Sequence, residues 1–213
     1  MNPAAFIRRE TRILSPPHVP EIKLHLADEA VELWQRTEEE LEAMGLPPPF
    51  WAFAWAGGQA LARYILDNPA LVRGRRVLDF ASGSGLVAIA AAKAGAAEVE
   101  ASEIDAFALE AIRLNAELNS VAVSIIDGDV VGEERGWEVI LAGDICYERD
   151  IAARVTEWLA ARAAAGMLVL IGDPGRTYLP KEKLEAAASY EVRVTRALED
   201  SDVKKSSIWR FKA

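Results

Sequence analysis

The middle of the chain alternates between short apolar runs and longer stretches in which apolar residues recur every three to four positions. Short apolar runs bounded by turn residues are typical of buried strands, and the longer period is typical of helices. Strands that alternate with helices indicate an α/β fold with a largely parallel sheet. The pattern predicts strands at 77–80, 98–102, 121–126, 139–143 and 167–172, and helices at 59–66, 86–94, 106–118 and 149–164.

The N-terminal residues depart from this rhythm. Residues 1–20 are rich in proline toward their end and are predicted to be irregular. Alternation of polar and apolar residues at 21–26 predicts a short strand, and helical spacing predicts a helix at 28–44. We therefore expect residues 1–48 to form a short N-terminal extension of one strand and one helix.

The C-terminal residues also change pattern. A helix is predicted at 181–187, followed by strands at 190–197 and 206–211. Two consecutive strands without an intervening helix indicate an antiparallel hairpin. We expect this hairpin to complete a single compact domain that spans residues 49–213.

Composition indicates a soluble globular protein. The chain has 213 residues, of which 51% are hydrophobic and 27% charged, enough for one sizeable core. Its apolar runs are too short to span a membrane. Arg8 and Arg9 lead into no secretory signal, and Glu10 argues against a transit peptide. A single cysteine, Cys146, excludes an intramolecular disulfide. We expect a cytoplasmic protein without membrane contact and favour a monomer.

Charge and histidine spacing argue against a nucleic-acid-binding surface and against a metal site. The net charge of −9 argues against binding nucleic acid, which usually requires a basic surface. It suits a basic partner, such as a lysine-rich protein segment, through long-range steering. The two histidines, His18 and His25, are not spaced as metal ligands relative to each other or to the cysteine, so we expect no metal site.

The glycine-rich turn after the strand at 77–80 is the main candidate for binding a ligand. Gly83 and Gly85 lack a Cβ, so a ligand can lie against bare backbone where the next helix begins. The turn fits the dinucleotide fingerprint, which is weak evidence alone. Asp79 would repel a pyrophosphate and attract a cation. S-adenosylmethionine has no phosphate and carries an ammonium and a sulfonium, so Asp79 favours it over NAD.

Acidic residues follow the next two predicted strands. Glu103 lies 20 residues after Gly83, the spacing at which an acid binds the two ribose hydroxyls of a nucleoside. Such an acid serves NAD and S-adenosylmethionine equally. Asp129, or a neighbouring amide, could bind an adenine amino group, although a simple turn explains the sequence nearly as well.

An aromatic stretch precedes the first helix of the predicted domain. Trp51 and Phe53 are as well explained by core packing as by a site. Trp55 is followed at once by Gly57 and Gly58, and an aromatic ring beside exposed backbone can cover a cationic or flat ligand. Trp55 is therefore a candidate ligand-binding residue.

Two other enzyme classes fit less well. An oxidoreductase of the Tyr-x-x-x-Lys type is disfavoured because Ile151 stands four residues after Tyr147. An enzyme with Cys146 as its nucleophile would need a base, and the only histidines, His18 and His25, lie more than a hundred residues upstream. The segment from Asp144 to Tyr147 also lacks the two prolines typical of methyltransferases that act on DNA or glutamine amides.

Three strings resemble one enzyme family: Trp-x-Gly-Gly-Gln-Ala-Leu at 55–61, Asp-x-x-Tyr at 144–147 and Gly-Asp-Pro-Gly-Arg at 172–176. The chain resembles the class I, seven-strand S-adenosylmethionine-dependent protein-lysine methyltransferases, above all those that act on the beta subunit of electron transfer flavoprotein. The resemblance covers most of the chain. It implies a Rossmann-like seven-strand sheet, mostly parallel with an antiparallel C-terminal hairpin, after the N-terminal extension.

The resemblance also implies a cofactor, a protein substrate and roles for particular residues. The implied substrate is the beta subunit of electron transfer flavoprotein, and the catalytic residues facing its lysine would be Asp144 and Tyr147. The family usually has Asp where this chain has Glu103, which would give the ribose contact a longer reach. S-adenosylmethionine would be held by Trp55, Gly57, Asp79, Ala81, Ser82, Gly83, Ser84, Gly85, Glu103, Ile104, Asp129 and Gly143.

Alternatives remain open at this point. A methyltransferase of the same fold could act on another protein, such as a ribosomal protein, or on a small molecule, because fold does not fix substrate. A third alternative is an NAD-type nucleoside-binding protein without turnover, and the acids Asp79, Glu103 and Asp144 argue against it.

Overall fold

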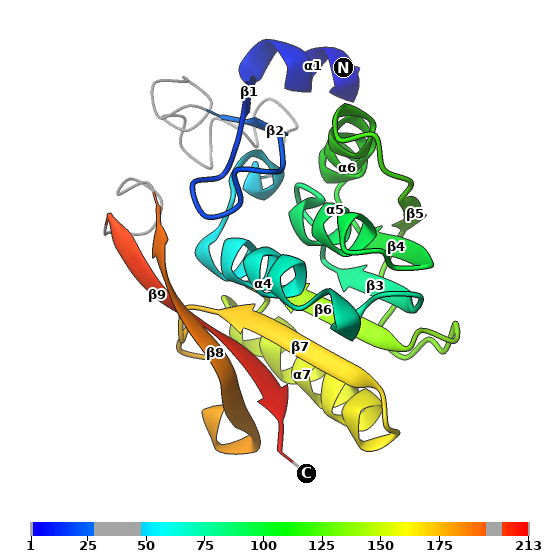
Figure 1. Cartoon of the computed structure of the whole chain (residues 1–213), viewed down its shortest axis with the longest axis vertical. Helices are drawn as coiled ribbons and strands as arrows, with labels where there is room; N and C mark the ends of the chain where they lie inside the picture. Colours follow the sequence, from blue (N-terminus) through cyan, green and yellow to red (C-terminus); the bar gives the residue numbers. More distant parts are fainter. Residues whose placement is uncertain (1, 28–47, 195–201, 213) are drawn as a thin grey trace.

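The computed structural model describes residues 2–27, 48–194 and 202–212. The helix predicted at 28–44 lies outside these residues, as does the end of the strand predicted at 190–197. Within the described ranges the chain forms a seven-stranded sheet flanked by helices, with a two-stranded hairpin near the N-terminus (Figure 1).

The strands of the main sheet are β3 (Arg76–Phe80), β4 (Glu98–Glu103), β5 (Ser124–Asp127), β6 (Val139–Gly143), β7 (Leu168–Asp173), β8 (Leu184–Arg193) and β9 (Val203–Phe211). Their order is β5-β4-β3-β6-β7-β9-β8, which confirms the predicted fold. The neighbours from β5 to β7 pair in parallel, and β9 is antiparallel to both β7 and β8. Strand order reverses between β3 and β6, and ligands bind at such a switch point in open α/β sheets.

Helices cover both faces of the sheet: α4 (Ala56–Asp67), α5 (Leu86–Lys93), α6 (Ala106–Leu118) and α7 (Arg149–Ala164). The first three lie on one face and α7 lies on the other (Figure 1). In β3, Val77 packs in the apolar cluster of α4 and α5, whereas Leu78 and Phe80 pack in that of α7. Strand side chains alternate between faces, so burial of both faces explains the continuous apolar runs in the sequence.

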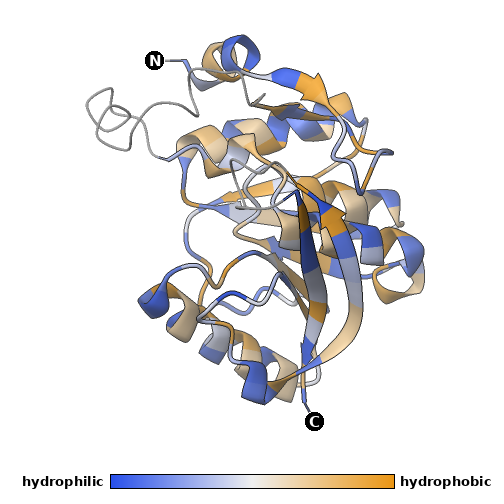
Figure 2. Ribbon diagram, turned by 90° about the vertical axis from the view of Figure 1, so that its left-hand side faces the viewer, coloured by the Kyte–Doolittle hydropathy of each residue, from blue (hydrophilic) through white to orange (hydrophobic). Residues whose placement is uncertain are grey.

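The helix predicted at 181–187 is wrong. Only Lys181–Lys183 forms a 3₁₀ turn, η3, and β8 begins at Leu184. The run Glu-Ala-Ala-Ala favours a helix, but β8 pairs with β9 along its length, from Leu184 opposite Phe211 to Arg193 opposite Val203. Tertiary pairing therefore overrides local propensity. Both strands carry hydrophilic as well as hydrophobic residues along this ribbon (Figure 2).

The prediction that residues 1–20 are irregular is also wrong. Residues Pro3–Glu10 form helix α1, capped by the Asn2 side chain, which accepts a hydrogen bond from the Ala5 N–H at 3.0 Å. Strands β1 (Arg12–Leu14) and β2 (Leu24–Leu26) form an antiparallel pair, so the strand predicted at 21–26 is confirmed in its second half.

The N-terminal extension packs on α6. The Phe6 ring of α1 lies 5.3 Å from the Phe107 ring, centroid to centroid. The buried Asn115 accepts a hydrogen bond from the His25 N–H at 2.8 Å and donates one to the Ser84 carbonyl at 2.8 Å. One side chain of α6 thus connects the extension to the glycine-rich turn.

Two short 3₁₀ helices, η1 (Phe50–Ala52) and η2 (Pro69–Leu71), flank α4.

Across the described residues, every helix is too short or too polar to cross a membrane. In the same part of the chain, no three His, Cys, Asp or Glu side chains are grouped as a metal site.

Candidate active site

The candidate site lies where four parallel strands end. β4, β3, β6 and β7 are neighbours in the sheet, so the loops that follow them begin at the same edge. These loops carry most of the predicted site residues. The start of α4 lies against the ends of β6 and β7 and brings Trp55 and Gly57 to the same edge.

The glycine-rich turn adopts a conformation that only a few residues tolerate. Ala81, Gly83 and Gly85 have φ angles of +51°, +56° and +81°. A hydrogen bond from the Ser82 N–H to the Ser102 carbonyl, 3.1 Å long, fixes the turn to β4. No heavy atom lies within 4 Å of the place where a Cβ of Gly83 would stand, so this backbone is open to a ligand.

Asp79 lies beneath the turn and is 1% exposed. Its Oδ2 accepts hydrogen bonds from the Ser82 hydroxyl at 2.5 Å and from the Ala88 N–H at 2.9 Å. Burial raises the pKa of this carboxyl to about 7, and the nearby Glu103 adds to the rise. Asp79 therefore shapes the turn from inside the protein, and its effect on a cationic ligand would act through charge.

The buried carboxyl of Asp79 should make the unfolding free energy of the protein depend on pH. With a pKa raised from 3.8 to about 7, folded Asp79 keeps a proton that the unfolded chain releases, so its stabilising effect is lost as pH rises between these values. The natural protein should therefore lose stability between pH 4 and pH 8, whereas Asp79→Asn lacks this titrating group. We expect the unfolding free energy of the variant minus that of the natural protein to rise by up to about 4 kcal/mol over this range. Chemical denaturation at several pH values measures this, and a constant difference would contradict it.

Glu103 connects the end of β4 to the turn. Its Oε2 accepts a hydrogen bond from the Gly83 N–H at 2.9 Å, and its Oε1 accepts one from the Ile104 N–H at 2.8 Å. Burial raises the pKa of the carboxyl. Next to it the Ile104 side chain is 75% exposed, which leaves an apolar surface free to meet a flat ring.

Asp129 is exposed after β5. Its Oδ2 forms an ion pair with Arg154 of α7 at 2.6 Å, and its Oδ1 accepts a hydrogen bond from the Val131 N–H at 2.9 Å. Both carboxylate oxygens therefore have partners within the protein. The proposed contact with adenine stays a prediction for this residue.

Glycines let α4 approach the strand ends at unusually short range. A Cβ at Gly57 would stand 2.2 Å from the carbonyl oxygen of Gly172 and 2.7 Å from Oδ2 of Asp144. A Cβ at Gly143 would stand 3.0 Å from the Cα of Gly58. The N–H of Gly58 can therefore donate a hydrogen bond of 2.7 Å to Asp144. Gly57 and Gly143 therefore allow close packing of α4 against the strand ends. Their contact with a cofactor stays a prediction.

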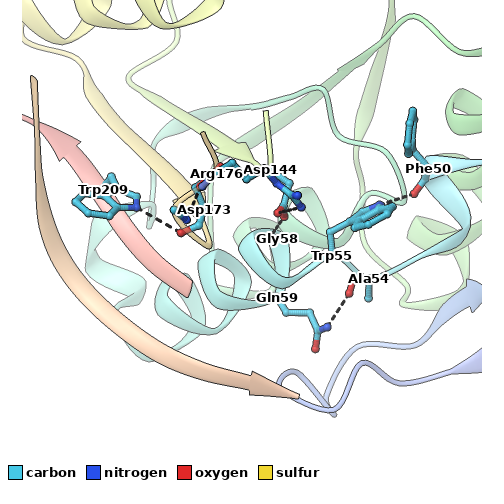
Figure 3. Close-up of polar contacts among 10 residues, drawn as sticks. Phe50, Ala54, Trp55, Gly58, Gln59, Asp144, Asp173, Arg176 and Trp209 are labelled. Atoms are coloured by element: carbon cyan, nitrogen blue, oxygen red, sulfur yellow. Dashed lines mark hydrogen bonds and ion pairs between the residues drawn. The ribbon is translucent and has the colours of Figure 1, made fainter. Parts of the chain in front are cut away.

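Asp144 is the polar centre of the site (Figure 3). It has a φ of +55°, its side chain is 10% exposed, and its Oδ1 accepts a hydrogen bond from an Arg176 guanidinium nitrogen at 3.0 Å. The guanidinium carbon of Arg176 lies 6.0 Å from the centre of the Trp55 ring. The Trp55 indole N–H donates to the Phe50 carbonyl at 2.9 Å, which fixes the ring.

Three aromatic rings form a partly exposed strip beside this centre. Tyr147 is 52% exposed and Phe50 is 50% exposed, and their rings lie 5.7 Å apart. Phe50 also lies 6.0 Å from the ring of Trp55. Large apolar side chains left exposed beside a polar cleft are typical of a binding surface.

A cavity of about 330 Å³ adjoins Tyr147 and Arg176. Tyr178 and Lys204 contribute to its wall, and so does the buried Cys146. Burial raises the pKa of the Cys146 thiol to about 12, so the thiol is protonated at neutral pH and is a poor nucleophile.

The sequence did not identify Phe50 and Arg176 as site residues. Arg176 ends one of the strings that carry the family resemblance, and Phe50 directly precedes Trp51 in the aromatic stretch, so these were the available signals. Their roles become visible only where α4, β6 and β7 meet.

Comparison with known proteins agrees with this geometry. Residues 60–163 match the family model "Ribosomal protein L11 methyltransferase (PrmA)". The electron transfer flavoprotein beta subunit lysine methyltransferase of Xenopus laevis is 39% identical over 98% of this chain and 87% of its own length. The human protein of the same name is 36% identical over 97% of this chain and 81% of its own.

The chain belongs to the electron transfer flavoprotein beta subunit lysine methyltransferase family. It is therefore an S-adenosylmethionine-dependent protein methyltransferase, which excludes the NAD-type alternative. The fold is also that of magnesium protoporphyrin IX methyltransferase from Synechocystis PCC 6803, solved with bound S-adenosylmethionine. That structure is 13% identical with a TM-score of 0.54, over 86% of this chain and all of the other.

Proposed function

We propose that this methyltransferase transfers methyl groups from S-adenosylmethionine to lysine side chains of the electron transfer flavoprotein beta subunit. The observation that carries the proposal is the identity of 39% and 36% to two relatives of that name over almost the whole chain. The carboxylate and aromatic rings gathered at Asp144 are the groups that a lysine side chain requires.

The residues at the turn fit the cofactor. The open backbone of Gly83 accepts a bulky group, the carboxylate of Glu103 suits ribose hydroxyls, and Ile104 offers an exposed apolar face. Buried Asp79 supplies negative charge for a cation when its carboxyl is ionised, and a bound cation favours that ionised form. When bound, S-adenosylmethionine supplies an electrophilic methyl group on its sulfonium.

On the lysine side, the chain orients the amine. Asp144 accepts a hydrogen bond from the incoming amine, and the rings of Trp55, Phe50 and Tyr147 surround its alkyl stem. A lysine with a pKa of about 10.4 must first lose a proton, and burial beside aromatic rings lowers that pKa.

Water accepts the proton. The pKa values of the Cys146 thiol and the Tyr147 phenol are both raised by burial, so neither group is ionised at neutral pH and neither acts as the base. With S-adenosylmethionine held at the turn, the lysine nitrogen would take its methyl carbon as the bond from that carbon to sulfur breaks, and the demethylated cofactor would then leave.

A ribosomal protein is the second candidate substrate, because residues 60–163 match the PrmA family. Purified electron transfer flavoprotein and ribosomal protein L11 are incubated separately with this enzyme and S-adenosylmethionine, and intact masses are measured. We expect gains in steps of one methyl group on the flavoprotein beta subunit. Gains on L11 alone would replace the proposed substrate with the second candidate.

Removing the Glu103 carboxylate should weaken cofactor binding. Glu103→Ala loses the hydrogen bond from the Gly83 N–H and the partner proposed for the ribose. We expect the dissociation constant for S-adenosylmethionine to rise about 10- to 100-fold, as for one or two hydrogen bonds to a charged group. Calorimetry measures this, with Glu98→Ala at the exposed opposite end of β4 as the control. Equal affinities for S-adenosylmethionine in the natural protein, Glu103→Ala and Glu98→Ala would show that Glu103 does not bind the cofactor.

A further inference from the structure

The carboxylate proposed to receive the lysine already holds a cation. Asp144 Oδ1 lies 3.0 Å from an Arg176 guanidinium nitrogen, and its Oδ2 accepts the Gly58 N–H at 2.7 Å. The two side chains of the ion pair are 10% and 24% exposed, so the pair is shielded from solvent. Shielded ion pairs interact more strongly than surface pairs.

The loop after β7 fixes the backbone of Arg176. Oδ1 of the buried Asp173 accepts hydrogen bonds from the N–H groups of Gly175 and Arg176, at 2.6 Å and 2.7 Å. Gly175 has a φ of +89°, and its carbonyl accepts a hydrogen bond from Lys181 Nζ at 3.1 Å. From this fixed backbone the guanidinium lies against Asp144 and near the ring of Trp55 (Figure 3).

This placement changes the electrostatics for an incoming amine. A carboxylate without a partner favours the charged ammonium and raises the pKa of a nearby lysine, and the ammonium cannot attack a methyl group. A fixed cation beside the carboxylate opposes that effect while leaving carboxylate lone pairs to accept a hydrogen bond.

Other charged or titratable groups around Asp144 are placed differently. Asp173 lies beneath the turn, where its Oδ1 accepts hydrogen bonds from backbone N–H groups and burial raises the pKa of its carboxyl. Tyr147, Glu148 and Lys204 lie toward the cavity and the start of α7. Glu103 lies on the cofactor side. Arg176 forms a direct ion pair with Asp144.

We infer that Arg176 is a positioning residue that holds Asp144 and offsets its charge, so that the substrate lysine is bound as its reactive neutral amine. This inference rests on the proposed lysine methylation. Arg176 makes no bond to the reacting atoms and acts through Asp144.

The test is the pH dependence of the single-turnover rate of methyl transfer, with cofactor saturating. We expect Arg176→Gln to move the acidic limb of the profile upward by about one pH unit, which lowers the rate about 10-fold near neutral pH and restores it at high pH. Arg176→Lys keeps the charge and should restore the profile. Arg210→Gln removes an exposed arginine paired with Glu185 and should leave the profile unchanged.

A purely structural role predicts a different result. If Arg176→Gln lowers the rate by one factor at every pH, or if Arg176→Lys fails to restore the profile, the inference is overturned. Thermal unfolding and S-adenosylmethionine affinity, measured on each variant, show whether the Gln variant is folded and loaded.

The choice of acceptor separates this inference from the proposed substrate. The beta subunit of electron transfer flavoprotein is used first, and a lysine-bearing protein that the natural enzyme labels in a cell extract is used if that subunit gains no methyl group. In the second case the substrate proposal fails and Arg176 is still tested. Transfer to no lysine at all would overturn both.

Discussion

Replacing Asp144 with asparagine should lower the rate of methyl transfer at least about 100-fold, because the variant loses the charged acceptor that orients the lysine amine. Asparagine is the suitable replacement, since Asp144 has a φ of +55° and asparagine tolerates this region better than alanine. The affinity for S-adenosylmethionine should stay within about three-fold of the natural value, because the effect is confined to the lysine side.

The matched control for this variant is Asp150→Asn, which makes the same chemical change at an exposed position in the first turn of α7. We expect natural turnover from the control. Loss of cofactor affinity in Asp144→Asn, with the control unaffected, would assign Asp144 to the cofactor in place of the lysine.

Gly57→Ala should be among the most destabilising single substitutions in the chain. Its methyl group would stand 2.2 Å from the carbonyl oxygen of Gly172, a backbone atom that cannot turn away, and 2.7 Å from Asp144. Relief requires α4 to move off the ends of β6 and β7. We expect a loss of about 3 kcal/mol or more of unfolding free energy, measured by chemical denaturation.

Gly58→Ala is the control next to it in the same helix. The nearest atom to its methyl group would be Oδ2 of Asp144, at 3.9 Å, which is ordinary contact. Alanine also favours a helix by up to about 1 kcal/mol over glycine. We expect Gly58→Ala to be as stable as the natural protein or more so. Equal losses in both variants would show that the close approach at Gly57 is not the cause.

Much of the central fold could be predicted from the sequence. The helices at 106–118 and 149–164 and the strand at 139–143 have the predicted bounds, because their periodicity and end signals agree. The ends of the chain were predicted poorly. The run Glu-Ala-Ala-Ala after Leu184 is helical by propensity and becomes a strand through long-range pairing with β9.

The site residues could be predicted where they lie within one short sequence motif whose backbone conformation is known. The turn at 81–85 and the acid at Glu103 follow from spacing along one strand-turn-helix unit. The partners of Asp144 could not be predicted in this way, because Gly58 and Arg176 reach it from segments 86 and 32 residues away. The burial of Asp79 beneath the turn likewise depends on how α5 packs.

The most direct test of this account is to locate the transferred methyl group. The enzyme is incubated with electron transfer flavoprotein and S-adenosylmethionine that carries a deuterated methyl group, and the digested flavoprotein is mapped by mass spectrometry. We expect deuterated methyl groups on lysine side chains of the beta subunit, lost with Asp144→Asn and retained with Asp150→Asn. Label on residues other than lysine, or unchanged label with Asp144→Asn, would contradict it.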